Sequence, residues 1–588
     1  MTLITKVLIA NRGEIAVRII RTCRELGVTS VVLCSEPDRG AFHTRLADEV
    51  IYIPGMSAAE SYLKIDAVIA AMSESGAEAV HPGYGFLSEN ATAAQAITDA
   101  GGIWIGPPPS AIAAMGSKLS ARAIAHAAGV PTVPGTSEPV TTAESIVAFA
   151  NNAGFPVAIK ASFGGGGRGM KVVFRAEDAA AALASATREA VASFGNGECF
   201  VERYLEWPRH VEVQVLADNH GTVLTVGERD CSVQRRHQKL IEESPAPNLS
   251  DDIKAKMAAA AVQLCRAVGY RNAGTVEMIY SNEEFFFLEM NTRLQVEHPV
   301  TEMVTGLDLV AEQLRIASGL PLSVSQHDIT VRGHAIEVRI NAEDPSGGRF
   351  TPSPGRLTSL HVPGGNGVRW DGGYEAGDLV SPFYDNLIGK LIVWGPDRET
   401  ARLRTIGALR ELTVTGVSTT IGADLHILEH DDFATVRHAT RWVEQELSFP
   451  DASAPDDIGP TDSEVGTSTH RRSEVEVNGR TYSVPRHDTA TPSAGPVTVV
   501  NSGPPATQRG NHVSKARATG RLLAPMQGTV IKVNATIGED VCAGDVLVVL
   551  EAMKMESPLI ADMDGTVTEL AVSAGSLVGP GDLLVVVS

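Results

Sequence analysis

The C-terminal part of the chain repeats itself with a constant offset of 37 residues, and this repeat limits the possible folds more than any other feature. Gly528–Val533 is echoed by Gly565–Leu570, and Val546–Val549 is echoed by Leu583–Val586. Each repeated segment is short, rich in β-branched residues and bounded by glycine turns, which is typical of strands. Two equivalent sets of strands predict a small β-sandwich of two similar halves.

The junction between the two repeats carries Lys554, which is flanked by two methionines. An apolar run leads into this stretch, so we expect Lys554 at the exposed tip of a hairpin. Exposed lysines are ordinary, but Ala552-Met553-Lys554-Met555 closely resembles the biotinyl domain of biotin-dependent carboxylases. That resemblance implies covalent biotin on Lys554. Lipoyl domains share this fold but usually have Asp-Lys at the tip, so the sequence favours biotin over lipoate.

Length and charge exclude several classes of protein. A chain of 588 residues predicts about four units at ~150 residues each. The net charge of −21 disfavours a nucleic-acid partner. Six scattered cysteines without a C-x-x-C pattern fit reduced thiols. The N-terminus lacks signal-peptide features, and no long apolar run predicts a membrane span, so we expect a cytoplasmic protein without a membrane partner.

The N-terminal segment predicts a parallel α/β unit. Lys6–Ala10 and Val31–Cys34 are strand-like, and a helix is expected to begin at Ile15 between them. The first turn lacks G-x-G-x-x-G, which disfavours a dinucleotide site. Ala79–Asn90 is a strand end followed by a glycine-rich loop, and open α/β sheets bind ligands at such ends. The loop by itself is equally consistent with a structural turn.

A second glycine-rich run follows a strand that ends in lysine. Val157–Lys160 precedes the run at 162–170, and strand-like residues resume at Val172. Glycines let backbone N–H groups approach phosphates, and lysines supply positive charge. A strand after the run disfavours a Rossmann fingerprint, and the order of lysine and glycines excludes a protein kinase. This order resembles the ATP-grasp fold. The resemblance implies that the following residues contact ATP: Lys118, Lys160, Gly165, Gly166, Glu202, Leu205, His210, Gln234 and His237.

Two acidic strands predict a metal site. Ala273–Tyr280 and Phe285–Asn291 are expected to form a hairpin, and a turn centred on Glu283 places Glu277 opposite Glu289. Facing carboxylates repel each other unless a cation joins them. Mg²⁺ prefers carboxylate oxygens together with nucleotide phosphates. We therefore predict Mg²⁺ or Mn²⁺ on Glu277, Glu289 and Asn291, with unrelated strand acids as the alternative.

The segment after this hairpin carries residue types suited to bicarbonate. Arg293, Gln295 and Glu297 continue the odd-numbered spacing, so strand alternation predicts that they share a face. An arginine binds an oxyanion, a glutamine orients it and a glutamate accepts a proton. Arg339, in the predicted strand His334–Ile340, offers a second fixed positive charge.

The motif Glu289–Pro299, together with the loop at 79–90, resembles biotin carboxylases, and the resemblance extends in order over residues 1–447. It implies bicarbonate at Gln295 and Val296, and a catalytic set of Glu297, Arg339, Arg293 and Lys239. In the family mechanism Glu297 deprotonates bicarbonate, which attacks ATP to give carboxyphosphate. Arg339 then stabilises the enolate-like ureido oxygen of biotin.

The expected fold class is α/β and α+β, with an all-β domain at the C-terminal end. The predicted parts are a biotin carboxylase N-terminal domain (1–114), an ATP-grasp domain (115–330), a biotin carboxylase C-terminal domain (331–447), a linker with a short hairpin (448–516) and a biotinyl domain (517–588). The stretch 451–516 is rich in Pro, Ser, Thr, Gly and Asp, which predicts a largely disordered tether of ~45 Å root-mean-square span. Its hairpin at 474–484 either docks a partner subunit or has no role.

These observations predict the α subunit of an acyl-CoA carboxylase. No stretch remains for a carboxyltransferase, so a separate β subunit is expected, with acetyl-CoA or propionyl-CoA as acceptor. The resemblance also implies a biotin protein ligase partner and a homo-oligomer through the carboxylase part within a larger α/β complex. Two alternatives are an ATP-grasp carboxylate–amine ligase with a lipoyl-like domain and a non-catalytic carrier. The Ala-Met-Lys-Met and 293–299 motifs disfavour the first, and the charged ATP-site residues disfavour the second.

Overall fold

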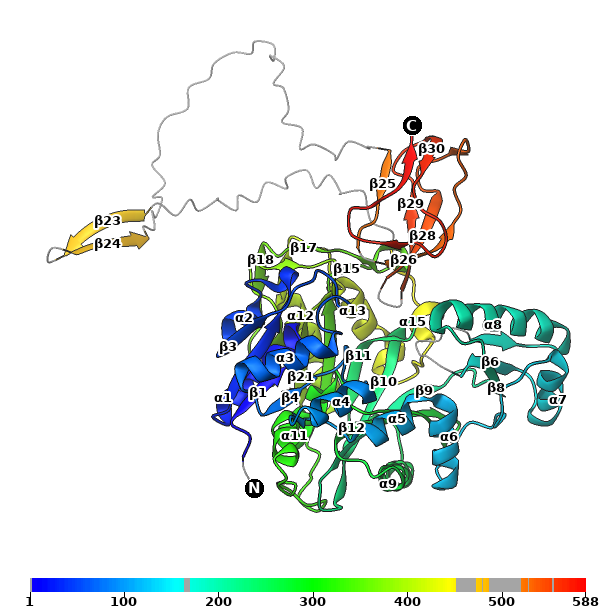
Figure 1. The fold of residues 1–588 in the computed structure, drawn as a ribbon, viewed down its shortest axis with the longest axis horizontal. Coiled ribbons are helices and arrows are strands. Elements are labelled where there is room, and N and C mark those ends of the chain that lie inside the picture. The colour runs from blue at the N-terminus through cyan, green and yellow to red at the C-terminus, as the bar shows by residue number, and fades with distance from the viewer. Residues whose placement is uncertain are drawn as a thin grey trace, which may run out of the picture. The chain divides into compact units, whose positions relative to one another are not determined.

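The computed structural model describes residues 3–162, 170–450, 472–477, 480–485, 520–526, 528–552 and 555–588 (Figure 1). The chain divides into two units, one made of residues 1–450 and 520–588 and the other of residues 451–519. The carboxylase-like part, the hairpin within 451–519 and the C-terminal β domain are described separately below.

A parallel sheet opens the chain, as predicted. Its five strands lie in the order β3-β2-β1-β4-β5, and every neighbouring pair is parallel. The strands are β1 (Lys6–Ile9), β2 (Thr29–Cys34), β3 (Glu49–Tyr52), β4 (Ala79–His81) and β5 (Ile103–Trp104). The helices of this part are α1 (Gly13–Glu25), α2 (Phe42–Leu46), α3 (Ile65–Ser75), α4 (Ala91–Asp99) and α5 (Pro109–Gly116).

The glycine-rich loop after β4 is held against the turn between β1 and α1. The Asn11 side-chain amide donates to the carbonyl oxygens of Pro82 and Tyr84, each at 2.7 Å. Gly83 has a left-handed φ of +63°, and a Cβ there would lie 2.9 Å from the Asn11 amide nitrogen. A side chain at position 83 would therefore both strain the backbone and displace Asn11.

A small three-stranded sheet carries the second glycine-rich run. The order is β7-β6-β8, with β6 (Val157–Ala161), β7 (Lys171–Val173) and β8 (Cys199–Arg203), and both pairs are antiparallel. Helices α7 (Ala143–Ala153) and α8 (Ala179–Phe194) pack on it, as Figure 1 shows. A strand resumes after the run, as predicted, whereas Gly165 and Gly166 lie outside the described residues.

The largest sheet is antiparallel and joins segments on both sides of the predicted boundary at residue 330. Its eight strands lie in the order β13-β12-β9-β10-β11-β14-β21-β19. They are β9 (Arg209–Ala217), β10 (Val223–Arg235), β11 (Gln238–Ser244), β12 (Asn272–Ser281), β13 (Glu284–Asn291), β14 (His334–Asn341), β19 (Val368–Gly372) and β21 (Leu387–Gly395). This sheet carries seven of the predicted site residues: His210, Gln234, Lys239, Glu277, Glu289, Asn291 and Arg339.

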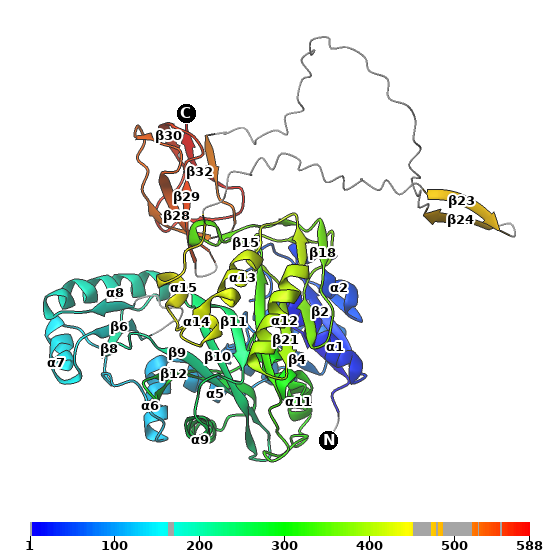
Figure 2. The same ribbon diagram turned by 180° about the vertical axis from the view of Figure 1, so that it is seen from behind.

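Helices cover different ends of this sheet. Helix α9 (Asp251–Ala267) and helix α6 (Lys118–Ala127) share a core with β9, β12 and β13. Helices α12 (Arg398–Glu411) and α13 (Ile421–Glu429) share a core with β14 and β21, and Figure 2 shows α12 lying over β21. The remaining helices are α10 (His298–Thr305), α11 (Leu309–Ala317), α14 (Asp431–Ala434) and α15 (Trp442–Gln445). Within the described ranges, no helix has the length and apolar character needed to span a bilayer.

Short strand pairs complete the carboxylase-like part. They are β15 (Glu343–Asp344) with β16 (Thr351–Pro352), β17 (Gly355–Arg356) with β20 (Leu379–Val380), and β18 (Ser359–His361) with β22 (Thr413–Thr415). In the separate unit, β23 (Arg472–Val477) and β24 (Arg480–Pro485) pair antiparallel, which confirms the predicted hairpin. Residues 451–471, 478–479 and 486–516 of the predicted linker lie outside the described residues.

The C-terminal domain is a β-sandwich, but each sheet takes strands from both repeats. One sheet has the order β25-β32-β30-β27 and the other β29-β28-β26-β31. The strands are β25 (Arg521–Leu523), β26 (Gly528–Val533), β27 (Asp540–Val541), β28 (Val546–Ala552), β29 (Met555–Ile560), β30 (Gly565–Leu570), β31 (Leu577–Val578) and β32 (Leu583–Val587). Ala552 pairs with Met555, so the described strands end on either side of Met553 and Lys554. Those two residues lie outside the described residues.

The predicted cross-strand pair Glu277–Glu289 is present, and a β-bulge produces it. The turn of the hairpin lies at Asn282-Glu283, both left-handed, so pairing begins with Ser281 opposite Glu284. Continued without interruption, this register would place Glu277 opposite Leu288. A bulge between the Glu277 and Met278 pairs shifts the register by one residue and brings Glu289 opposite Glu277.

Candidate active site

A buried ammonium group, that of Lys239, lies at the centre of a cluster of carboxylates on the eight-stranded sheet. Its Nζ lies 2.7 Å from Glu212 Oε2, 3.1 Å from Glu277 Oε1 and 2.6 Å from Glu297 Oε1. Lys239 projects from β11, Glu212 from β9 and Glu277 from β12, while Glu297 immediately precedes α10. Antiparallel register therefore brings together residues that are far apart in the chain.

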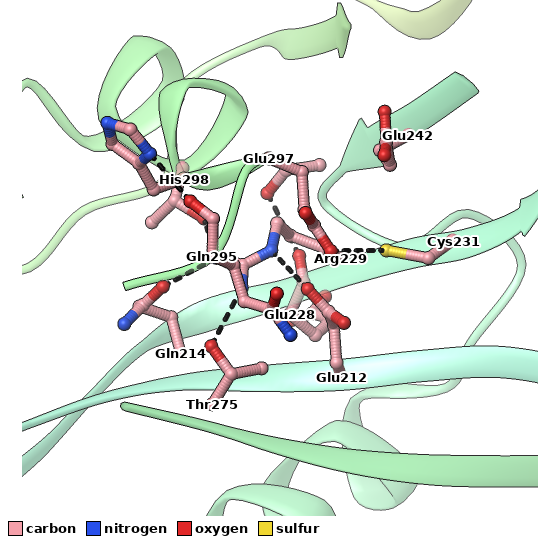
Figure 3. Close-up of polar contacts among 12 residues, drawn as sticks. Glu212, Gln214, Glu228, Arg229, Cys231, Glu242, Thr275, Gln295, Glu297 and His298 are labelled. Carbon is pink, nitrogen blue, oxygen red and sulfur yellow. Dashed lines mark hydrogen bonds and ion pairs between the residues drawn. The ribbon is translucent and has the colours of Figure 1, made fainter. Parts of the chain in front are cut away.

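Glu297 is held by cations on both of its oxygens. The second oxygen, Oε2, lies 2.9 Å from Arg339 Nη2, and Arg339 Nε also donates to Glu242 at 2.6 Å. The Cys231 thiol donates to Glu297 Oε1 at 3.7 Å, as Figure 3 shows. Burial alone would raise the pKa of Glu297, but the charges of Lys239, Arg339 and Arg229 hold it well below the ordinary value. Glu297 is therefore a carboxylate at neutral pH.

Arg229 organises the floor of this cluster. Its guanidinium is fully buried and donates to Glu212 Oε1 at 2.6 Å, Gln214 Oε1 at 2.7 Å and Thr275 Oγ1 at 3.0 Å. It also donates to Thr301 Oγ1 on α10 at 2.9 Å. Figure 3 shows Glu212, Gln214 and Thr275 converging on Arg229 from neighbouring strands. The arginine thus ties Glu212 to α10, the helix that follows Glu297.

The segment after β13 is not a strand, so the predicted strand alternation of Arg293, Gln295 and Glu297 is wrong. Strand β13 ends at Asn291, and residues 292–297 form bends and a turn that lead into α10. Pro299 stands in the first turn of α10, a position that suits proline because the N–H of that residue needs no partner. The polar side chains nevertheless converge, through a hydrogen-bond network.

Gln295 is the centre of that network. Its Nε2 donates to Glu277 Oε1 at 2.8 Å and to Asn291 Oδ1 at 2.6 Å. Its Oε1 accepts from Arg293 Nη1 at 2.7 Å. Arg293 is anchored in turn by Glu89, with Nε 2.8 Å from Oε2. The loop after β4 therefore supports this end of the site.

The predicted metal ligands offer oxygen atoms, which suit Mg²⁺. Glu289 Oε1 accepts from Asn291 Nδ2 at 3.3 Å, and His210 Nε2 lies 3.2 Å from Glu277 Oε2. Among the described residues, the groups close enough to share one ion are His210/Glu212/Glu277 and Glu212/Cys231/Glu297. Glu277 belongs to the first group, whereas Glu289 belongs to neither. The donor chemistry fits a hard cation, and the assignment to Glu277, Glu289 and Asn291 stays a prediction.

The predicted nucleotide residues come from several elements. Lys160 and Glu202 lie on the small sheet, His210 on β9, Lys118 at the start of α6, and Gln234 and His237 at the β10–β11 turn. Glu202 on β8 accepts an ion pair from Lys160 on β6 and lies 2.9 Å from Arg122 Nη1. Leu205 follows β8 and is half-buried. Lys118 begins α6, and the charges of Lys118 and Lys160 act on the imidazole of His237. Burial lowers the pKa of His237, and the positive charges of Lys160 and Lys118 lower it further, so the two predicted ATP-binding lysines lie near a neutral imidazole.

The β10–β11 turn is strained. Arg236 and His237 both have left-handed φ values, +47° and +63°, which cost non-glycine residues roughly 1–2 kcal/mol each. Gln234, at the end of β10, donates from Nε2 to the Cys231 carbonyl at 3.0 Å. Backbone strain of this kind clusters at ligand-binding segments, and here it falls on a predicted ATP-binding turn.

Several site residues escaped prediction from the sequence. Glu212 had a signal, because it alternates with His210 and Gln214 on one face of a strand. Glu89 lies within the glycine-rich loop at 79–90, for which the sequence predicted a ligand-binding loop but no role for this side chain. Arg229 and Glu242 had no local signal, because their partners are distant in the chain.

Comparison with family models gives four matches along the chain. Residues 3–112 match the N-terminal domain of biotin carboxylase, and residues 117–325 match the ATP-binding domain of the carbamoyl-phosphate synthase L chain. Residues 337–445 match the biotin carboxylase C-terminal domain, and residues 520–587 match the model of biotin-requiring enzymes. In this order they define an ATP-dependent biotin carboxylase followed by a biotinyl carrier domain.

Relatives cover most of the chain. The biotin-dependent acyl-coenzyme A carboxylase alpha3 subunit of Mycobacterium leprae is 47% identical over 95% of this chain and 94% of its own length. The biotin carboxylase of Haemophilus influenzae is 51% identical over 76% of this chain and all of its own. The chain therefore belongs to the family of biotin-dependent acyl-CoA carboxylase α subunits.

Solved structures agree with this membership. A crystal structure of Campylobacter jejuni biotin carboxylase covers 75% of this chain and 98% of its own, with a TM-score of 0.73 and 43% identity. The biotin carboxylase domain of the 2-oxoglutarate carboxylase from Hydrogenobacter thermophilus covers 76% of this chain and 98% of its own, with a TM-score of 0.72 and 44% identity. The parallel sheet and the ATP-grasp part are thus confirmed. The match of residues 520–587 to biotin-requiring enzymes and the two four-stranded sheets there confirm the all-β C-terminal domain.

Proposed function

We propose that this chain loads a carboxyl group from bicarbonate onto biotin at Lys554, using ATP, and passes it to a separate carboxyltransferase subunit that acts on acetyl-CoA or propionyl-CoA. The observation that carries the proposal is Glu297, a buried carboxylate held between Lys239 and Arg339 beside the Arg293–Gln295 pair. The Hydrogenobacter structure was solved with MgADP, ADP and bicarbonate, which supports the same ligands here.

The side chains divide the chemistry of the first step. Arg293 and Gln295, with the backbone of Val296, bind and orient bicarbonate. Glu297 takes its proton, so that a bicarbonate oxygen forms a bond to the γ-phosphorus of ATP while the bond to ADP breaks. Lys239 balances the carboxylates of Glu212 and Glu277 around the reacting oxygens. Because Glu297 is already ionised, it is ready to accept the proton throughout the neutral range.

Mg²⁺ and biotin would complete the site. Mg²⁺ held by Glu277, Glu289 and Asn291 would supply positive charge to the nucleotide phosphates. Biotin would supply the ureido nitrogen that accepts the carboxyl group. Arg339 has one guanidinium edge on Glu242 and Glu297, and we assign it to charge developing on the ureido oxygen. Lys118, Lys160, Glu202, Leu205, His210, Gln234 and His237 are assigned to ATP.

The partner and acceptor rest on the relatives. The Mycobacterium relative is named as the alpha3 subunit of an acyl-coenzyme A carboxylase, which supports a transferase on another subunit. Acetyl-CoA and propionyl-CoA are the acceptors that we propose. A biotin protein ligase would attach biotin, and we propose a homo-oligomer of the carboxylase part within an α/β complex in the cytoplasm.

The test uses purified chain with ATP, Mg²⁺, labelled bicarbonate and both acyl-CoA esters. Label should reach the protein and stop there, and Lys554→Ala should abolish both labelling and streptavidin recognition. The same variant should retain bicarbonate-dependent ATP hydrolysis with free biotin, because Lys554 only carries the substrate. Streptavidin binding by Lys554→Ala would refute the carrier assignment. Labelled acyl-CoA formed without a second polypeptide would refute the separate transferase.

A further inference from the structure

Lys390 is a fully buried lysine that the mechanism above does not use. It lies on β21, directly opposite Arg339 on β14 and Asp371 on β19. Paired residues of antiparallel strands project to the same face of the sheet. Arg339, Lys390 and Asp371 therefore form one row across three strands, with the reactive end at Arg339.

The ammonium group of Lys390 contacts the bicarbonate segment directly. Its Nζ donates to the Val296 carbonyl oxygen at 2.7 Å. It lies 3.4 Å from Glu14 Oε2 on α1, and 5.9 Å from the centre of the Tyr84 ring. Lys390 thus joins three elements at one point: the helix after β1, the glycine-rich loop after β4 and the segment before α10.

The row holds two consecutive residues of the site. Arg339 binds the carboxylate of Glu297 at 2.9 Å, while its cross-strand neighbour Lys390 binds the carbonyl of Val296. Residues 292–297 belong to no strand or helix, so they have no regular backbone hydrogen bonds to fix them. A charged donor on the Val296 carbonyl supplies that constraint.

The Glu14–Lys390 pair is costly as a purely structural device. Replacing a buried ion pair with apolar residues is often neutral or stabilising, because desolvation opposes the attraction. Apart from Lys390, neither carboxylate oxygen of Glu14 has a hydrogen-bond partner among the described residues. Burial also raises the pKa of Glu14 to about 7, against the charge of Lys390. A pair this poorly solvated calls for a role beyond stability.

We propose that Lys390 is a positioning residue for bicarbonate, which fixes Val296 and with it the direction of Glu297, and that Glu14 anchors Lys390 from helix α1. This inference rests on the proposed function of the Arg293–Glu297 segment. The other titratable groups that act on this row are Arg369 on β19, Glu337 on β14, Arg18 on α1 and His298 on α10. Burial favours the neutral forms of Glu337 and His298, because it raises the pKa of Glu337 and lowers that of His298.

The test compares steady-state kinetics of bicarbonate-dependent ATP hydrolysis, with free biotin, for the full-length chain and Lys390→Met. Methionine keeps the length and the burial but removes the charged donor. We expect the KM for bicarbonate to rise about tenfold or more, as for loss of a charge-assisted hydrogen bond, with the KM for ATP within twofold. Lys254→Met is the matched control, because Lys254 pairs with Glu228 away from this row.

A second variant guards against misfolding. In Lys390→Met/Glu14→Gln no unpaired charge remains, so the double variant should fold and show the same rise in bicarbonate KM. A bicarbonate KM unchanged in a folded variant, or an equal rise in both KM values, would overturn the positioning role. Wild-type chain without bicarbonate-dependent ATP hydrolysis would overturn the proposed function itself, and this inference with it.

Discussion

Glu297→Gln separates the charge of Glu297 from its shape, and it tests the assignment on which the mechanism depends. Glutamine retains one acceptor oxygen but cannot take a proton from bicarbonate. Loss of acid–base catalysis typically costs ~10²-fold or more in rate, which corresponds to at least ~2.7 kcal/mol in the activation barrier. We therefore expect kcat to fall by at least ~10²-fold, with little change in ATP affinity.

The structure indicates that this variant folds. Breaking a buried ion pair usually costs ~3–5 kcal/mol, because one charge loses its partner. Here Lys239 keeps Glu212 and Glu277, and Arg339 keeps Glu242. Burial raises the pKa of Glu242 to about 7, and the charge of Glu297 adds to that rise. Removing Glu297 therefore favours the ionised form of Glu242, and we expect a smaller loss of about 2 kcal/mol in unfolding free energy.

The assays are steady-state ATP hydrolysis with bicarbonate and biotin, and chemical unfolding. Glu228→Gln is the matched control, because Glu228 lies on β10 near the cluster but pairs with Lys254. Since cations hold the pKa of Glu297 well below its ordinary value, the wild-type profile of kcat/KM should show no Glu297 ionisation above pH 5. Near-normal turnover in Glu297→Gln would refute the role. A second outcome would also refute it: a change in the wild-type kcat/KM between pH 6 and 7 that disappears in Glu297→Gln but persists in Glu242→Gln.

Two further changes test the metal site and the stability of the fold. Glu289→Ala should raise the Mg²⁺ concentration needed for half-maximal activity and lower kcat, whereas Glu284→Ala on the same strand should do neither; equal Mg²⁺ titrations for all three proteins would contradict the assignment. Burial raises the pKa of Glu343 to about 7, so the folded state holds a proton that the unfolded chain releases, and stability falls as pH rises from about 4.5 to 7. Glu343→Gln keeps the acceptor for Asn386 Nδ2, which lies 2.9 Å from Oε1. In urea unfolding, the free energy of unfolding of this variant should exceed that of wild type by up to ~3 kcal/mol at pH 8 and equal it at pH 4.5. The same difference at both pH values would disprove the raised pKa of Glu343.

Local pattern predicted the elements of the site well, because strands and glycine turns leave short-range signals. The parallel opening, the β12–β13 hairpin and the strand that carries Arg339 were all predictable. The prediction of the Glu277–Glu289 pair assumed a turn centred on Glu283, whereas the turn is centred between Asn282 and Glu283. The bulge compensates for that error, and nothing in the sequence marks it.

Long-range contacts explain what the sequence did not reveal. Lys239 and Glu297 are 58 residues apart, and Arg339 and Glu242 are 97 apart. Their meeting depends on the order of the strands in the eight-stranded sheet, which no local period encodes. At residues 293–297 the local pattern itself was misleading. Alternating polar residues occur both in half-buried strands and in polar turns, so the sequence predicted a strand where the structure has a turn. Pro299 was the signal that could have ended the strand.

The 37-residue repeat in the C-terminal domain extends to the register of its strands, which the sequence alone did not reveal. In the pair of β25 and β32, Arg521 lies opposite Val586 and a bulge precedes Leu523. The pair of β29 and β28 has the same register 37 residues away, with Pro558 opposite Val549 and a bulge before Ile560. Each sheet therefore uses both repeats, because a single repeat cannot bury its own apolar face. The hairpin end of β28 and β29, at Ala552 and Met555, therefore corresponds in the other sheet to the start of β25 and the end of β32. Strands β28 and β29, which flank residues 553 and 554, lie in one sheet, whereas β25, which begins at Arg521, lies in the other.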